Sequence, residues 1–239
     1  MTTHPHHRPP TSPAHWEEEA KPRPRKMLYI GGSITHNIDW DALGKVTNST
    51  IRRKKAYGST YASSQRFPES NFEDVVPSEL RKDNYDILVM QASSTDLTNL
   101  PENASRGLQS ASARISSRNM VRIATEAARN NPNLKWVILM ERIPRYDEKT
   151  ELNEYANRIL HETNQEPNYP ASDKVFIGRH ELKCEGKLRE DRYGIPWSPE
   201  QRLPRHRCGD GIHMRGTTGK ADYTRSVCQI ISQIIEKPM

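Results

Sequence analysis

A serine near the start of the chain and an aspartate-histidine pair near its end are the residues best suited to chemistry. Ser33 follows a short apolar run, Met27 to Ile30, and two glycines, while Asp210 and His213 are separated by two residues. A serine hydroxyl becomes an effective nucleophile when a histidine takes its proton and a carboxylate orients that histidine. The three side chains therefore predict a Ser-His-Asp triad and hydrolytic chemistry.

The surroundings of Ser33 favour one way of presenting this nucleophile over another. A glycine-flanked turn after a strand directs the hydroxyl into the space above the carboxyl edge of a sheet. The nucleophile elbow of α/β-hydrolases needs Gly-x-Ser-x-Gly, but Thr35 stands where the second glycine belongs. That fold also takes its acid and its histidine from separate loops, whereas Asp210 and His213 share one turn. The spacing argues against an α/β-hydrolase.

The order of these segments carries a family resemblance. Gly-Gly-Ser-Ile at Gly31 to Ile34 and Asp-x-x-His ending at His213 resemble the first and last blocks of the SGNH (GDSL-type) hydrolases, which read Gly-Asp-Ser and Asp-x-x-His. The resemblance covers residues 26 to 236 as a series of blocks, with a glycine in place of the first aspartate. It implies a serine esterase without metal or organic cofactor, in which Ser33 is the nucleophile, His213 the base and Asp210 the orienting acid.

The resemblance also implies an oxyanion hole. The amide of Ser33 is one donor, and the glycine amide of the family's second block has its candidate in Gly58. The third block reads Gly-x-Asn-Asp in the family, whereas this chain has Ser-Ser-Thr-Asp at 93–96, so the asparagine is missing. Loss of one oxyanion donor costs about 10²- to 10³-fold in rate in other enzymes. We therefore expect low activity, or a third donor in the hydroxyl of Thr95 or Ser94.

Apolar patterning predicts the fold. Short continuous apolar runs are typical of strands buried on both faces of a parallel sheet, and four such runs occur, at 28–30, 87–90, 136–140 and 175–177. A fifth, more polar strand at 49–56 is expected at an edge. Helical patterns alternate with the strands, starting near Asp39 and covering 105–130, 151–162 and 218–236. Together they predict a three-layer α/β/α sandwich, flavodoxin-like, with five parallel strands in the order 2-1-3-4-5.

Caps and apolar stripes define two of the helices. Asp39 and Ser105 are residue types that accept hydrogen bonds from the first free amides of a helix. In the helix that begins near Asp39, we expect Leu43 and Val46 to face the core, and in the long helix we expect the same of Ile115.

The start of the chain differs from the rest. Residues 1–25 contain six prolines and no apolar periodicity, so we expect a disordered tail or a linker from a larger polypeptide, followed by one domain at 26–239. No segment resembles a signal peptide or a membrane span, and the three cysteines lack the spacing of a disulfide framework. We therefore expect an intracellular, cytoplasmic protein that does not contact membranes.

The charge of the chain leaves a nucleic-acid partner open. The net charge is +6, and the densest basic run is Arg52 to Lys55. This run lacks the interleaved aromatic residues typical of base stacking. A solvated edge strand is the better explanation, because basic side chains on an edge block pairing with other sheets.

Two further segments are candidates for contact with a substrate. Residues 182–207 show no periodicity, and they form either a lid over the site or a surface insertion. Arg142 and Arg145 follow the fourth strand, at the edge where open α/β sheets bind ligands. Either arginine binds an anionic group of a substrate or pairs with nearby acids.

The sequence leaves two functions open. The complete set of Ser33, Asp210 and His213 favours an esterase that hydrolyses a small-molecule ester, with a short acyl group such as acetate according to the resemblance. The missing asparagine, the basic charge and the linker-like tail favour a catalytically degraded SGNH-like domain that binds nucleic acid or protein within a larger protein.

Overall fold

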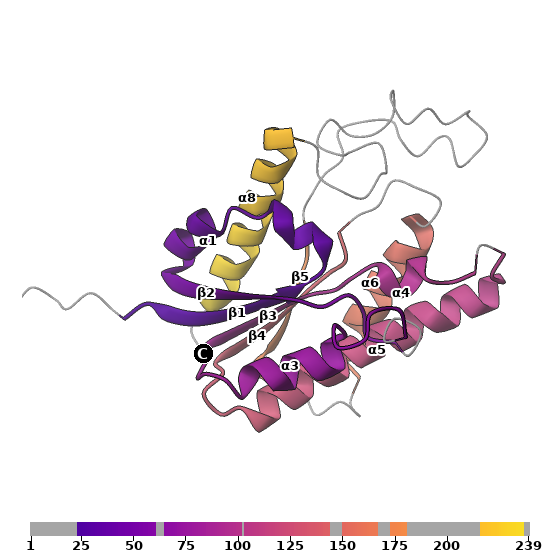
Figure 1. The fold of residues 1–239 in the computed structure, drawn as a ribbon, viewed down its shortest axis with the longest axis horizontal. Helices are drawn as coiled ribbons and strands as arrows, with labels where there is room; N and C mark the ends of the chain where they lie inside the picture. Colours follow the sequence, from indigo (N-terminus) through magenta and orange to yellow (C-terminus); the bar gives the residue numbers. More distant parts are fainter. Residues whose placement is uncertain are drawn as a thin grey trace, which may run out of the picture.

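A five-stranded parallel sheet lies at the centre of the molecule (Figure 1). The computed structural model describes residues 23–60, 65–101, 103–143, 150–166, 173–180 and 216–236. The strands are β1 (Arg25–Gly31), β2 (Ser49–Lys55), β3 (Ile87–Gln91), β4 (Trp136–Met140) and β5 (Val175–Gly178). Their order across the sheet is β2-β1-β3-β4-β5, and each neighbouring pair is parallel. This order confirms the predicted flavodoxin-like topology.

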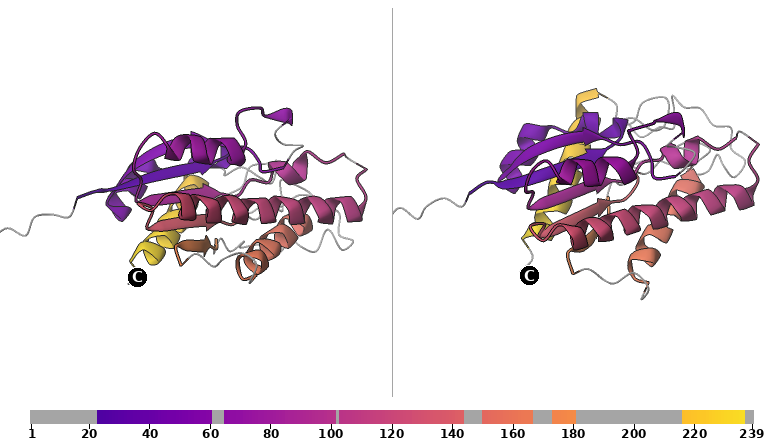
Figure 2. Two further views of the ribbon diagram at one scale, coloured as in Figure 1. Left: turned by 90° about the horizontal axis from the view of Figure 1, so that it is seen from below. Right: turned by 60° about the horizontal axis from the view of Figure 1, so that its bottom comes forward.

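Helices cover both faces of the sheet and make three layers (Figures 1 and 2). One face carries α1 (Trp40–Thr47) and α8 (Gly216–Ile235), and the other carries α3 (Phe72–Leu80), α5 (Arg106–Asn130) and α6 (Thr150–Asn164). Two short elements, the 3-10 helix η1 (Ser33–Asn37) and the helix α4 (Thr95–Thr98), follow β1 and β3. Because β1 and β3 are adjacent, η1 and α4 start side by side at the carboxyl edge of the sheet.

The strands feed two separate cores. In β1, Leu28 and Ile30 pack on the side of α3 and α5, whereas Met27 and Tyr29 pack on the side of α1 and α8. This alternation follows from the two-residue period of a strand. All residues of β3 and β4 are buried, because helices cover both of their faces. Three of the four apolar runs seen in the sequence are therefore the central strands, and the fourth is the edge strand β5, whose two middle residues are half-buried.

The edge position predicted for the polar strand is confirmed. In β2, Arg52 and Lys54 lie 3.0 and 3.6 Å from the carboxylate of Glu79, whose side chain is almost completely buried in α3. Arg53 points to the other face and lies 5.3 Å from the ring centre of Trp40. Three of the four consecutive basic residues thus have partners within the chain, which accounts for the basic run without an external polyanion.

Both predicted helix caps are confirmed, but the prediction that Val46 and Ile115 face the core is wrong. Asp39 and Ser105 each accept the amide three residues further on, at 3.0 and 3.2 Å. Val46 is 56% exposed, because the buried stripe of the short helix α1 runs through Leu43 instead. Ile115 is 52% exposed; it lies in the first half of α5, which extends past the sheet in Figure 1.

No helix is predicted from the sequence at α3, and that omission is an error. Asn71 caps α3 by accepting the Asp74 amide at 2.9 Å, and Pro77 stands inside the helix, where it removes one amide donor.

Among the described residues, no helix has the length and apolar character required to cross a membrane.

Candidate active site

Ser33 lies immediately beyond the carboxyl end of β1, where the sequence predicts it. It is the first residue of η1, and it is exposed to solvent. The carbonyl of Gly32 accepts both the amide of Thr35, at 3.2 Å, and its hydroxyl, at 2.7 Å. These bonds close a tight turn that presents Ser33 at the edge of the sheet.

The two glycines before Ser33 have different surroundings. A Cβ atom at Gly31 would lie 2.5 Å from Cγ2 of Thr35 and 2.9 Å from Cβ of Gln91, so only glycine fits where β1 passes β3 and η1. A Cβ atom at Gly32 would meet nothing closer than Oγ of Ser93, at 3.5 Å. The space around Gly32 is therefore large enough for the Cβ atom of the family's aspartate.

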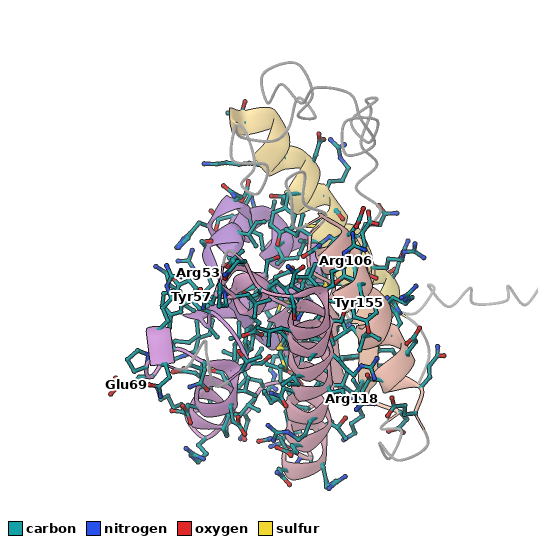
Figure 3. The ribbon with its side chains drawn as sticks, turned by 90° about the vertical axis from the view of Figure 1, so that its right-hand side faces the viewer. Arg53, Tyr57, Glu69, Arg106, Arg118 and Tyr155 are labelled. Carbon is teal, nitrogen blue, oxygen red and sulfur yellow. The ribbon has the colours of Figure 1, made fainter. Side chains whose placement is uncertain are left out.

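The loop after β2 brings Gly58 to the same edge. Ala56 donates its amide to the carbonyl of Gly31 at 3.2 Å, which ties this loop to the end of β1. Gly58 is buried, and its carbonyl accepts the amide of Phe72 at 2.9 Å. A Cβ atom at Gly32 would lie 3.6 Å from Cδ1 of Tyr57. Figure 3 faces this edge, with Tyr57 on the side of β2 and Tyr155 on the side of α6.

A buried carboxylate connects the Gly58 loop with the segment after β3. Asp96, in α4, is 3% exposed. It accepts the amide and hydroxyl of Ser59, the amide and hydroxyl of Thr60, and the hydroxyl of Ser116 from α5. The second and third blocks of the resemblance are thus held together by one side chain, which lies directly after the position of the missing asparagine.

A buried arginine stands behind this carboxylate. Arg142 is fully buried; its guanidinium donates to the carbonyl of Ser93 at 3.0 Å and to the hydroxyls of Ser116 and Ser117. Burial lowers the pKa of Arg142 to about 10, against the opposing effect of Asp96, so it stays charged at neutral pH. The hypothesis that Arg142 binds an anionic substrate group is wrong, because its side chain does not reach the surface. Arg145 lies outside the described residues.

The hydroxyls that follow β3 are not equivalent. Ser94 donates its proton to Oδ1 of Asn153 in α6 at 3.0 Å. Oγ1 of Thr95 lies 2.7 Å from Oγ of Ser93, which also accepts the amide of Thr95 at 3.1 Å. In the sequence, Ser93 falls at the glycine of the third block and has no predicted role, yet its oxygen is the one that faces Gly32.

A second buried polar cluster, which the sequence analysis missed, lies under the site. Oε1 of Gln91 accepts the hydroxyls of Tyr223 and Tyr29, at 3.1 and 3.4 Å, and contacts Nε2 of His180 at 3.4 Å. Nδ1 of His180 lies 3.1 Å from Oγ of Ser226. Burial raises the pKa of Tyr29 well above its usual value, so its phenol is a neutral donor. The cluster joins β1, β3, the end of β5 and α8.

Several predicted site residues lie outside the described residues. These are Asp210, His213 and the whole segment 182–207, so the predicted triad stays a prediction. Within the described ranges, no group of three or more histidine, cysteine, aspartate or glutamate side chains is arranged to hold a metal ion.

An open cleft of about 740 Å³ lies between α1 and the edge strand β2. Its lining includes Trp40, Lys45, Ile51 and Arg53. Ser33 and the residues after β3 do not line it, so it is separate from the candidate site.

Comparison with known proteins reveals relatives only at the level of structure. No family model matches the chain, and no curated protein matches it. The structure resembles Axe2, an acetylxylan esterase from Geobacillus stearothermophilus, at 16% identity and a TM-score of 0.52 over 87% of this chain and 94% of that chain. A catalytic mutant of Axe2, in which a serine is replaced by alanine, matches at 15% identity and a TM-score of 0.50, with the same coverage.

A third solved structure is also similar. It is a carbohydrate esterase whose active site displays divergent catalytic and non-catalytic binding functions. It matches at 13% identity and a TM-score of 0.54, over 90% of this chain and 70% of that chain. These likenesses confirm the predicted SGNH hydrolase fold.

Proposed function

We propose that the chain is a serine esterase with Ser33 as its nucleophile. The observation that carries this proposal is the position of Ser33, exposed at the carboxyl end of β1 in a fold shared with acetylxylan esterases. In one of those neighbours a serine-to-alanine change makes a catalytic mutant. The loop of Gly58 and the turn of Ser93 lie on either side of Gly32, which supports an oxyanion site beside the nucleophile.

The remaining triad members in this proposal are His213 and Asp210. Contacts between η1 and α8 support their convergence on Ser33, as does the bond from the amide of Asp39 to the hydroxyl of Thr224 at 2.9 Å. Only three residue steps separate His213 from the start of α8, and such a stretch spans at most about 11 Å. The helix that follows the base is therefore packed on the element that carries the nucleophile.

The proposed reaction has two steps. Oγ of Ser33 bonds to the acyl carbon while His213 takes the hydroxyl proton, and the carbonyl electron pair moves onto oxygen. When this intermediate collapses, the bond to the alcohol oxygen breaks and His213 returns its proton to the leaving alcohol. Water then attacks the acyl-enzyme in the same way, releasing the acid and Ser33. Asp210 orients His213 throughout.

The proposed acyl group is short. The neighbours in structure include esterases named for acetylated xylan and xylo-oligosaccharide, and acetate is the acyl group that the sequence resemblance implies. An acetyl ester is therefore the first substrate to test, with acetylated sugars as the second.

The decisive experiment measures hydrolysis of p-nitrophenyl acetate and labelling by a fluorophosphonate probe. We expect Ser33→Ala to abolish both, while Ser110→Ala, at an exposed serine on α5, leaves both intact. The rate should fall below about pH 6 to 7, as His213 becomes protonated. Equal rates for the wild type and Ser33→Ala would mean that the signal is background hydrolysis and would refute the proposal.

A binding domain is the second candidate, and the missing asparagine favours it. The neighbour whose active site displays divergent catalytic and non-catalytic binding functions supports this candidate. A nucleic-acid partner receives less support, since Arg52, Arg53 and Lys54 have partners within the chain. Absence of Ser33-dependent turnover, together with salt-sensitive binding of a single-stranded oligonucleotide, would favour this alternative.

A further inference from the structure

We propose that the hydroxyl of Ser93 replaces the missing asparagine as the side-chain donor of the oxyanion hole. This proposal rests on the esterase function proposed above and names a residue that the sequence resemblance does not assign. In the family's third block this position is a glycine, which has no side chain to donate.

The main chain of Ser93 is held in place from behind. Its carbonyl accepts Nε of the buried Arg142 at 3.0 Å, and the preceding residue, Ala92, donates its amide to the carbonyl of Met140 at 3.0 Å. Ser93 is thus fixed to both β4 and the loop after it. A donor that is fixed before the reaction stabilises developing charge without reorganising, which is the condition for a strong oxyanion effect.

Either hydroxyl of the Ser93–Thr95 pair can be the donor, and the arrangement in which Thr95 donates leaves the Ser93 proton available. The Ser93 oxygen accepts the amide of Thr95 at 3.1 Å and lies 2.7 Å from Oγ1 of Thr95. When the Thr95 hydroxyl donates to Ser93, both accepting positions of the Ser93 oxygen are filled. The Ser93 proton then has no acceptor among the described residues. Accepting two bonds also strengthens the bond that a hydroxyl donates.

The Ser93 hydroxyl faces the nucleophile's turn. Its oxygen would lie 3.5 Å from a Cβ atom at Gly32, the residue directly before Ser33. In the family motifs these two positions carry an aspartate and a glycine, whereas here they carry a glycine and a serine. Of these two facing positions, the family has its side chain at the first, whereas this chain has it at the second, Ser93. Because Gly32 has no side chain, no Cβ of residue 32 stands between the Ser93 hydroxyl and the turn that carries Ser33.

The neighbouring hydroxyls are less suited to the role. The proton of Ser94 is used by Oδ1 of Asn153 at 3.0 Å. The amide group of Asn153 donates to the carbonyl of Ile143, which fixes its oxygen as the acceptor for Ser94. Thr95 contacts Ser93 rather than the turn of Gly32. In the reaction, Ser93 donates a hydrogen bond to the oxygen that gains charge and keeps its proton.

The test compares substitutions in the third block with p-nitrophenyl acetate as substrate. We expect Ser93→Ala to lower kcat about 10²- to 10³-fold with little change in KM, because the bond forms mainly in the transition state. Ser93→Thr, which keeps the hydroxyl, should retain most of the activity. Thr98→Ala, at an exposed threonine on α4, the helix that follows Ser93, is the control and should match the wild type.

A second pair of variants separates the loss of a hydrogen-bond donor at Ser93 from a structural defect of Ser93→Ala. Ser93→Gly restores the family's glycine and should lose activity as Ser93→Ala does. Adding Thr95→Asn to it rebuilds the complete family block and should recover kcat, which a purely structural role of Ser93 does not predict.

Three outcomes would overturn the proposal. If Ser93→Ala and Ser93→Gly turn over like the wild type while Ser33→Ala is inactive, Ser93 is no donor although the esterase function stands. If the large loss of kcat appears at Thr95→Val or Ser94→Ala instead, the donor is that residue. If the wild type shows no turnover that depends on Ser33, the esterase function itself fails and the role of Ser93 fails with it.

Discussion

Gly31 and Gly32 precede the nucleophile side by side, and the same substitution should affect them differently. Gly31→Ala places a methyl group 2.5 Å from Cγ2 of Thr35 and 2.9 Å from Cβ of Gln91, far inside normal contact. Neither atom is the free end of a long side chain, so η1 or β3 must shift. Overpacking of this kind costs about 1 to 3 kcal/mol, which lowers Tm by roughly 2 to 12 °C in a domain of this size.

Gly32→Ala is the matched control. Its new methyl group meets only contacts of 3.5 and 3.6 Å, and Gly32 has φ −80° and ψ −159°, which alanine adopts without strain. We expect a change within about 0.5 kcal/mol. Urea unfolding followed by circular dichroism measures both variants, and ester hydrolysis shows whether the shifted η1 also misplaces Ser33. Equal unfolding midpoints for the two variants would refute the packing argument.

Three further predictions concern buried polar groups. Asp96→Asn removes a carboxylate that accepts five hydrogen bonds and lies near the charge of Arg142. The free energy of unfolding, measured by urea titration, should therefore fall by about 2 to 5 kcal/mol. A loss below about 0.5 kcal/mol would contradict this account. Burial acts to raise the pKa of Glu79, but hydrogen bonds from Lys82 and Arg52 outweigh it and lower the pKa below its ordinary value of 4.5. The ionised Glu79 side chain therefore contributes its full stability above pH 4.5, and this stability is lost as the pH falls through the lowered pKa. Glu79→Gln should therefore flatten the acid end of a plot of urea midpoint against pH, and an unchanged slope would count against the role of this carboxylate. Tyr223→Phe should destabilise by about 0.5 to 1.5 kcal/mol and by more than Tyr29→Phe, because their bonds to Gln91 are 3.1 and 3.4 Å; the reverse order in thermal melts would show that packing outweighs these bonds.

The three central strands of the sheet were predictable from the sequence because they are buried on both faces. Runs such as Ile87 to Met90 leave few alternatives to a central parallel strand, and the basic strand beside them has to be an edge. The helix at Phe72 to Leu80 was missed although its signal is present. Asn71 is a cap, and apolar residues follow at 72, 75 and 76, the spacing of a helical face. Pro77 obscured that signal.

The candidate site was less predictable, because the roles of its polar residues depend on contacts with residues that are distant in the chain. Arg142 looks like a surface arginine in sequence, and only the packing of α5 against β4 shows that it is buried beside Ser116. His180 and Gln91 are single polar residues at strand ends, 89 positions apart. Ser93 stands at a glycine position of the family motif, and its proposed role depends on an oxygen facing Gly32 that no motif encodes.

One face of the sheet stays uncovered until α8 has been synthesised. Its apolar residues include Met27, Tyr29, Val89 and Ile138, and α8 contributes much of their cover. Until the ribosome has made α8, a growing chain carries this surface uncovered and is prone to aggregate or to bind chaperones. Asp210 and His213 come directly before that helix. Under the proposed mechanism, the helix that covers the core is made directly after the catalytic base, so a chain that stops before α8 is expected to be unstable and inactive.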